Sequence, residues 1–380
     1  MLNTNNKALG IIFPNSYDTL MPELASERTM ASIPFASRYR MIDFVLSSMV
    51  NAGIDNVSLV VRKNYLSLLD HLGSGREWDL TRKNGGLNIV PPFSQNTSKV
   101  YAGRVDALIG IAEFIKRQKE EYVVLSDANV ACNFDFEALV NAHIAKGADV
   151  TVAYRKAGLP TSNNDAFELK KEFYYTLAIE DGKVKDIAIN EEGEGVYDLS
   201  MNMYVLRKDL LLSLIKEAHV KGYVYFERDV LLPKLDKLNV QAYEFTGYVA
   251  DFHDLESYFK TSMDLLDQTK LEALFGPAPI YTKVRDDNPT RYVLGAKVKN
   301  TMAADGCIIE GEVKNCILFK GVKIAKGAKV KNCILMQDTV VEEGADLEYV
   351  VADKDVTLTK DVQLKGADNF PVYVGKGKTV

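Results

Sequence analysis

Two aspartates stand where this sequence could carry metal chemistry. Asp127 ends the apolar segment 122–127, and Asp251 follows the apolar residues 248–250 and precedes a helical pattern. Two carboxylates brought together could hold Mg²⁺, which in turn binds the oxygens of a triphosphate. Spacing alone favours a helix cap or a turn acid for each of them. His253 has no second histidine near it, and we interpret it as a loop or cap residue.

The elements that must position these aspartates alternate between strand and helix over the first two-thirds of the chain. Apolar runs indicate strands at 8–13, 57–61, 122–127 and 148–154, with a hairpin at 174–189. Apolar residues spaced three or four apart indicate helices at 38–50, 105–115, 136–144, 210–219, 227–235 and 255–266. This rhythm predicts an α/β domain, a mostly parallel Rossmann-like sheet with helices on both faces. Ligands bind at the carboxyl ends of such strands, where Asp127 stands.

The last hundred residues contain a short repeat. The pentapeptide KNCIL occupies residues 314–318 and returns intact at 331–335, an offset of 17 residues. The same offset relates Glu312 to Lys329 and Asp346, so the charges alternate along the repeat. Coils about 4.8 Å apart would pair these charges. We therefore predict a left-handed parallel β-helix built from hexapeptide repeats.

Length divides the chain into two domains. With 380 residues, the chain exceeds the roughly 250–300 at which a single core stops growing. A proline-bearing stretch separates the two patterns. We place the α/β domain at 1–275, a linker at 276–290 and the β-helix at 291–380.

Composition argues against several classes of partner and location. Lys and Arg number 46 against 52 Asp and Glu, a net charge of −6, which gives no support for binding nucleic acid. No apolar run approaches the roughly 18 residues that span a bilayer, and residues 1–7 lack the pattern of a secretion signal. The four cysteines form no CxxC pair. We expect a reduced, cytoplasmic protein that binds neither nucleic acid nor membrane.

Segments along nearly the whole chain resemble the ADP-glucose pyrophosphorylase (glucose-1-phosphate adenylyltransferase) family. They are residues 33–44 (IPFASRYRMIDF), 101–107 (YAGRVDA, against Y-R-G-T-A-D-A), 125–127 (LSD, against G-D-H), 200–205 (SMNMYV, against S-M-G-I-Y-V), 226–229 (FERD, against D-F-G-K-D) and 250–253 (ADFH, against R-D-V-G-T). The resemblance implies a nucleotidyltransferase domain followed by a β-helix. It also implies metal-binding roles for Asp127 and Asp251.

The departures from the family pattern concern groups that would hold phosphate. Active members open with a glycine-rich loop, G-G-x-G-T-R-L, whose backbone N–H groups reach the nucleotide phosphates. This chain reads FPNSYDTL there, so the motif is lost at Phe13, Pro14 and Asn15. Met30 replaces one family lysine, and a second lysine has no counterpart near residue 190.

These departures are similar to those of the GlgD-type subunit of bacterial glycogen synthesis. The resemblance implies a regulatory subunit with little or no activity that assembles with the catalytic glucose-1-phosphate adenylyltransferase subunit. Four subunits are typical of the family, so we expect a hetero-tetramer. Mg²⁺ would then act through the partner subunit or bind weakly at Asp127 and Asp251. ATP, glucose 1-phosphate or an anionic effector are the small molecules such a subunit would meet.

Several basic and acidic residues are candidates for binding these molecules. The candidates for nucleotide or sugar phosphate are Arg28, Arg40, Arg104 and Asp106. The candidates for an anionic effector are Arg62, Lys323 and Lys326, although a solvated outer face explains the lysines equally simply.

One other function remains open at this stage, and a further one has little support in the sequence. A competent sugar-1-phosphate nucleotidyltransferase would need Mg²⁺ at Asp127 and Asp251, with arginines in place of the missing lysines. A hexapeptide-repeat acyltransferase would need a catalytic histidine on the β-helix. All four histidines lie outside it, at positions 71, 143, 219 and 253.

Overall fold

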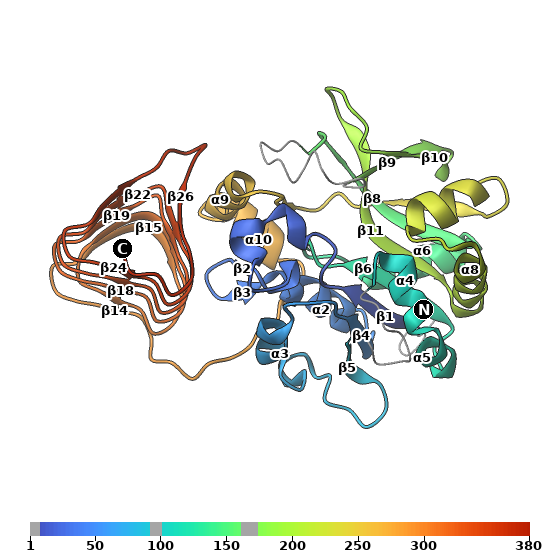
Figure 1. Ribbon diagram of the computed structural model, residues 1–380, viewed down its shortest axis with the longest axis horizontal. Helices are drawn as coiled ribbons and strands as arrows, with labels where there is room; N and C mark the ends of the chain where they lie inside the picture. The colour runs from blue at the N-terminus through green and yellow to red at the C-terminus, as the bar shows by residue number, and fades with distance from the viewer. Residues whose placement is uncertain (1–7, 92–100, 161–173) are drawn as a thin grey trace.

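The computed structural model describes residues 8–91, 101–160 and 174–380, and it consists of two domains side by side (Figure 1). Residues 1–7, which bear on the expectation about a secretion signal, lie outside the described residues. The α/β domain ends with α10 (Gln268–Phe275), and the first strand of the second domain is β14 (Arg291–Tyr292). Within the described ranges, no helix has the length and apolar character needed to cross a membrane.

A nine-stranded sheet forms the centre of the α/β domain over the described residues. In spatial order its strands are β5 (Gly86–Val90), β4 (Asn56–Val60), β1 (Ala8–Phe13), β6 (Tyr122–Asp127), β11 (Tyr197–Arg207), β8 (Val150–Ala157), β12 (Val240–Glu244), β10 (Lys183–Ile189) and β9 (Tyr175–Glu180). Strands β11 and β10 run opposite to the others. The sheet is therefore mostly parallel, as the alternation of elements predicts.

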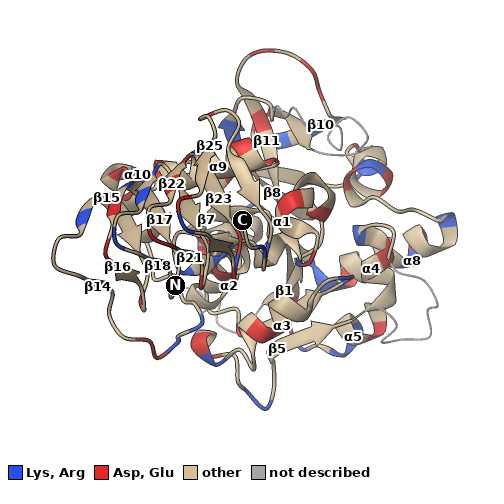
Figure 2. Cartoon of the chain, turned by 60° about the vertical axis from the view of Figure 1, so that its left-hand side comes forward, with Lys and Arg blue, Asp and Glu red and all other residues tan. Residues whose placement is uncertain are grey.

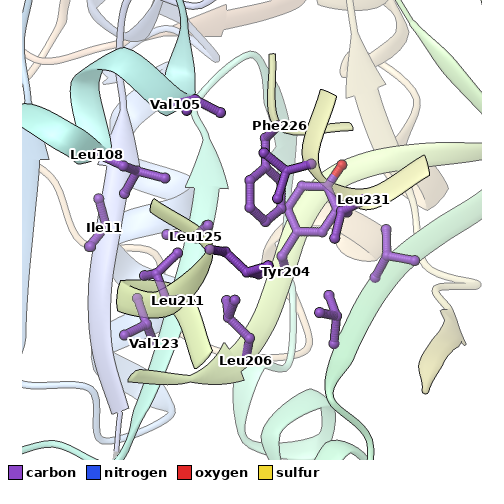
Figure 3. Packing of buried hydrophobic residues seen from close by; sticks show 14 of the residues in the cluster. Ile11, Val105, Leu108, Val123, Leu125, Tyr204, Leu206, Leu211, Phe226 and Leu231 are labelled. Carbon is purple, nitrogen blue, oxygen red and sulfur yellow. The ribbon is translucent and has the colours of Figure 1, made fainter. Parts of the chain in front are cut away.

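Helices cover both faces of this sheet and create two apolar cores. One core contains α2 (Met41–Asn51), α3 (Leu66–Leu72) and α6 (Phe136–Ala145). The other contains α4 (Arg104–Gly110), α5 (Ala112–Arg117) and α8 (Lys208–Lys221). Figure 3 shows part of the second core, where the rings of Tyr204 and Phe226 lie together. Strands β1 and β6 are buried along almost their whole length, which is why both read as continuous apolar runs.

Local structure differs from the sequence expectation in several places. The helix expected at 105–115 is two helices, because Ile111 leaves the helical conformation between α4 and α5. The helix expected at 227–235 is a π-helical turn (Phe226–Leu231) followed by a 3₁₀ turn (Leu232–Lys234) that contains a proline. Strands β5, β11 and β12 are not predicted by the apolar pattern.

The second domain is a left-handed parallel β-helix, whose stacked coils form a triangle in Figure 1. One sheet contains β14, β16 (Ile308–Ile309), β18 (Lys323–Ile324), β21 (Val340–Val341) and β24 (Thr357–Leu358). The other sheet contains β15 (Lys297–Ala303), β17 (Glu312–Leu318), β19 (Lys329–Lys331), β20 (Ile334–Leu335), β22 (Asp346–Glu348), β23 (Val350–Ala352), β25 (Gln363–Lys365) and β26 (Val372–Val374).

The register of the coils confirms the repeat read from the sequence. Ile317 pairs with Ile334, which pairs with Val351, so the offset is 17 residues. Glu312 pairs with Lys329, and Lys329 pairs with Asp346, which is the expected order of charges.

Asparagines turn one corner of the coils. Asn300, Asn315 and Asn332 adopt left-handed backbone conformations, with φ of 47°, 51° and 50°. Asparagine tolerates this region better than most residues, because its short side chain bonds locally. The side-chain amide of Asn300 donates to Asn315 (3.1 Å), and that of Asn315 donates to Asn332 (3.2 Å). The repeated asparagine thus supports both the turn and the stacking.

A third apolar core joins the two domains. It combines side chains of α2, α9 (Leu255–Asp264) and α10 with β-helix residues such as Ile317, Ile334 and Val351. Ser37 adds a hydrogen bond across the junction, because its hydroxyl donates to the carbonyl oxygen of Leu318 (3.0 Å). The β-helix therefore packs directly on the domain that carries the candidate aspartates.

Candidate functional site

A cavity of about 290 Å³ opens at the carboxyl ends of β1 and β6, where the sheet topology predicts a ligand site. Its walls come from the loop after β1, residues 62–63 after β4, the start of α4 and residues 225–227. Arg104 and Asp127 both line it, so the structure brings these two predicted residues together. Arg62 lines it as well, although the sequence suggests it for an effector rather than for this site.

The loop after β1 uses its polar groups on itself and on its neighbours. The Asn15 side-chain amide donates to the Asp18 carboxylate (2.6 Å), and the Met30 backbone N–H donates to the same carboxylate (2.7 Å). The Asn15 side-chain oxygen accepts the backbone N–H of Arg62 (2.8 Å). Pro14 has no N–H to offer. The loop is thus closed by a buried carboxylate in the region where the related motif would present N–H groups to phosphate.

Asp18 is a buried acid, with 7% of its surface exposed. Burial raises the pKa of its carboxyl from 3.8 to about 6, although the hydrogen bonds from Asn15 and Met30 and the nearby Lys63 and Arg62 oppose this shift. A carboxylate in this position repels an anionic ligand whenever it is ionised. An ionised Asp18 therefore acts against the binding of a polyphosphate next to this loop.

Asp127 ends β6, as expected, and its two carboxylate oxygens are engaged by the chain itself. The Ser16 hydroxyl donates to Oδ1 (2.7 Å), and the Arg104 guanidinium donates to Oδ2 (2.7 Å). Arg104 also forms a short ion pair with Glu227 from the turn after Tyr225. Gly103 allows this approach, because a Cβ there would lie 2.6 Å from the Val224 carbonyl oxygen.

Asp251 borders a separate, smaller cavity of about 50 Å³. It lies on β13 (Val249–Asp251), whose partner strand β7 (Val130–Cys132) follows Asp127 in the chain. Arg155 forms an ion pair with Asp251 at 2.5 Å. Tyr17 lines both cavities, and the Asn202 side-chain amide donates to its hydroxyl (2.5 Å). The strand that carries Asp251 therefore pairs with the strand that follows Asp127, but each aspartate forms an ion pair with a different arginine.

Mg²⁺ does not fit these two aspartates as they stand. Magnesium demands a near-octahedral set of oxygen ligands. Ser16 and Arg104 already bond both oxygens of Asp127, and Arg155 bonds Asp251. Among the residues that the structure describes, no group of three or more His, Cys, Asp or Glu side chains could hold a metal ion. His253 lies at the start of α9, where its backbone N–H donates to Ser257, in keeping with a cap or loop role.

Arg28 and Arg40, suggested by the sequence as nucleotide ligands, lie at the domain junction instead of in the cavity. Arg28 donates to both carboxylate oxygens of Asp353 on the β-helix (2.8 Å each), and both side chains are almost fully buried. Arg40 donates to the carbonyl oxygen of Ser67 (2.6 Å). Burial and the nearby Arg40 and Arg28 lower the pKa of the neighbouring Lys354 to about 7. Over the described residues, the two arginines thus bond to neighbouring elements and do not line the cavity.

The remaining candidates occupy less specific positions. The Asp106 carboxylate accepts the backbone N–H of Ala102 (3.0 Å), which makes it a local bond at the start of α4. Lys323 and Lys326 are exposed on the β-helix, and Lys323 borders a shallow groove there. Figure 2 shows basic and acidic segments interspersed along both domains. Neither lysine approaches the cavity lining.

Sequence reasoning missed Glu227, Arg155 and Ser16, which hold the candidate residues in place. The sequence did contain one indication that Arg104 and Glu227 are in contact. Arg104 stands where the resembling motif has threonine, and Glu227 stands where it has glycine, so two opposite charges appear together. Such a reciprocal change points to contact between two segments that lie far apart in the sequence.

Comparison with known proteins agrees with this architecture. Residues 19–268 match the family described as Nucleotidyl transferase, and residues 284–369 match the GlmU-like, C-terminal hexapeptide family. The chain is similar to the glycogen biosynthesis protein GlgD of Bacillus subtilis, at 36% identity over 98% of this chain and 97% of that protein. It is 39% identical to GlgD of Geobacillus stearothermophilus over 85% of this chain and 83% of that protein.

A second group of relatives is named glucose-1-phosphate adenylyltransferase. The glucose-1-phosphate adenylyltransferase of Geobacillus stearothermophilus is 29% identical over 85% of this chain and 82% of that enzyme. The similarity to both groups runs through both domains. The chain therefore belongs to the nucleotidyl transferase family and, within it, to the GlgD group of glycogen biosynthesis proteins, which is related to ADP-glucose pyrophosphorylase.

Proposed function

We propose that this chain is a regulatory subunit of glucose-1-phosphate adenylyltransferase with little or no catalytic activity of its own. The reaction of that enzyme joins ATP and glucose 1-phosphate to give ADP-glucose and pyrophosphate. In this proposal the chain acts in the cytoplasm, in bacterial glycogen biosynthesis, as part of a hetero-tetramer with the catalytic subunit.

The observation that carries the proposal is the closed loop after β1. Its Asp18 carboxylate accepts hydrogen bonds from Asn15 and from the backbone of Met30, inside the region that would have to receive the nucleotide phosphates. The transferring phosphates collect negative charge in the transition state, so backbone donors and cations there lower the barrier. Loss of one such donor typically lowers the rate by about 10²–10³. A buried acid in their place raises the barrier further.

The relatives support a two-subunit arrangement. Geobacillus stearothermophilus has both a protein named GlgD and a glucose-1-phosphate adenylyltransferase, and this chain is similar to both. Its identity is higher to the former (39%) than to the latter (29%). A chain that has kept both domains but changed its phosphate loop is well suited to change a partner's kinetics or response to an anionic effector.

The experiment is to mix the purified chain with the catalytic subunit from the same organism. We expect light scattering to give the mass of a mixed tetramer, and we expect the mixture to differ from the catalytic subunit alone in rate or in activation by sugar phosphates. The heat-denatured chain serves as the control for added protein. If no complex forms and the partner's kinetics stay the same, the proposal is wrong.

The retained aspartates favour one alternative, a catalytically competent sugar-1-phosphate nucleotidyltransferase. It would require Arg104 to release Asp127 so that Mg²⁺ could bind between the protein and the nucleotide. A rise in melting temperature with ATP that depends on Mg²⁺ would support this alternative. We expect no such dependence.

A further inference from the structure

Three charged side chains form a compact cluster in the wall of the larger cavity. The Arg104 guanidinium lies between the carboxylates of Asp127 and Glu227 and pairs with both. The exposed fractions of these side chains are 10%, 1% and 4%. The cluster is therefore shielded from solvent, and its charges interact more strongly than they would in water.

Neighbouring groups add further hydrogen bonds to the two carboxylates of the cluster. The Tyr204 hydroxyl donates to Glu227 (2.8 Å), and the Ser16 hydroxyl donates to Asp127 (2.7 Å). The Arg104 Cζ atom lies 5.5 Å from the ring centres of both Phe13 and Tyr204, a cation–π distance. Burial alone would lower the pKa of Arg104, but Asp127 and Glu227 outweigh it and hold this pKa well above its usual value. Arg104 is thus a permanent cation.

The sequence also indicates that Arg104 and Glu227 form a specific pair. In the segments that this chain resembles, position 104 is threonine and position 227 is glycine, neither of which carries charge. Here one position has gained a positive charge and the other a negative charge, and the two side chains meet. Asp127 both pairs with Arg104 and lines the cavity.

We infer that Arg104 is a built-in counter-cation that takes the place of a divalent metal ion at Asp127, and that Glu227 positions it. This inference rests on the proposed function and deepens it, because it gives a reason why the cavity does not work with Mg²⁺. A metal ion could reach Asp127 only by displacing the guanidinium. Displacement would leave a buried cation with one partner fewer, which is strongly unfavourable.

The test is titration of the full-length chain with Mn²⁺, followed by electron paramagnetic resonance and by melting temperature. We expect the wild type to have no Mn²⁺ site that depends on Asp127. The Arg104→Gln variant leaves Asp127 and Glu227 facing each other without a cation, and we expect it to gain one Mn²⁺ site that is at least roughly tenfold tighter than any residual Mn²⁺ binding by the wild type. The variant R104Q/D127N is the matched control and loses this site.

A double variant covers the case in which Arg104→Gln fails to fold. R104Q/E227Q removes one charge of each sign and leaves the net charge of the cavity unchanged. We expect it to fold and to bind Mn²⁺ through Asp127 more tightly than the wild type, although more weakly than R104Q. Equal binding by the double variant and the wild type would contradict the inference.

Two further outcomes would overturn the inference. One is a wild-type Mn²⁺ site that disappears in the Asp127→Asn variant. The other is a folded R104Q variant with no gain in Mn²⁺ affinity. These results are distinguishable from a failure of the proposed function, because an inactive chain that binds Mn²⁺ at Asp127 overturns only the inference. A chain that is active without binding metal there overturns only the proposed function.

Discussion

Individual residues decide whether the cavity can serve polyphosphate chemistry. Asp18, Asp127 and Glu227 place three carboxylates at or near its walls, and Arg104 is engaged with two of them. Within the described part of the chain, the cations that remain in the lining are Arg62 and Lys63. The cavity lies where the sheet topology predicts a ligand site, but the described residues of its lining include as many carboxylates as cations.

The buried Asp18 carboxyl predicts a pH dependence of stability. Its pKa is about 6 in the folded protein against 3.8 as the ordinary value, so the folded state binds more protons between these values. The contribution of Asp18 is therefore fully present below pH 3.8 and is lost as the pH rises through about 6. From the size of the shift, the difference in unfolding free energy between wild type and Asp18→Asn falls by about 2 kcal/mol from pH 4 to pH 7. Urea denaturation across this range measures it.

The comparison with Asp18→Asn removes pH effects that come from other groups. Both proteins share every other titrating side chain, so the difference isolates the carboxyl at position 18. A difference that does not change with pH would mean that folding does not shift the pKa of Asp18, and it would contradict the prediction.

At this scale, the sequence offered Arg104 as a nucleotide candidate and Asp127 as a metal candidate, and the structure places both in the lining of one cavity. The sequence could not predict the partner of Arg28. The bond to Asp353 joins residues 325 positions apart, and no spacing rule relates them. Asp127 was predicted as a metal ligand, but its bonds to Ser16 and Arg104 depend on three segments meeting.

Elements with a strict period were the most predictable from the sequence. The β-helix repeats every 17 residues over several coils, and its register in the structure is the one that the intact pentapeptide predicts. The α/β domain has no such repeat. Its strands β5 and β11 were missed, and the break at Ile111 was missed, because packing on the sheet decides these features.

The asparagine corner gives a prediction at the scale of elements. Asn315 has φ of 51° and bonds to both neighbouring asparagines. Asn315→Ala should lower the unfolding free energy by about 1–3 kcal/mol, from left-handed strain and lost hydrogen bonds. Asn315→Gly should cost less, because glycine adopts this conformation without strain. Denaturant unfolding of the two variants measures the difference.

The critical result is which of the two variants loses more unfolding free energy. Equal losses for alanine and glycine would mean that the corner conformation contributes nothing and that only the amide bonds matter. A larger loss for glycine would contradict the account of this corner.

At the scale of the whole molecule, the junction fixes the β-helix on the α/β domain. The Tyr373 hydroxyl donates to Asp353 (2.9 Å), and Asp353 accepts the Arg28 guanidinium, so three elements meet at one buried carboxylate. Burial raises the pKa of Tyr373 above its ordinary value, and the Asp353 charge adds to this shift.

Asp353→Asn should strongly destabilise the junction. It leaves the Arg28 cation buried without a counter-charge, and breaking a buried pair in this way costs about 3–5 kcal/mol. Glu312→Gln is the matched control, because it breaks an exposed pair with Lys297 on the same β-helix, and we expect no measurable change. Thermal and urea unfolding compare the two variants. Similar small effects would mean that the Arg28–Asp353 pair does not stabilise the junction.

The rate of pyrophosphate release by the isolated chain tests the central claim most directly. The assay supplies ATP, glucose 1-phosphate and Mg²⁺, with no other subunit present. Because Asp18 closes the loop and Arg104 holds Asp127, we predict a turnover far below the roughly 1–10³ s⁻¹ of ordinary enzymes. A turnover within that range that is lost in the Asp127→Asn variant would contradict the account.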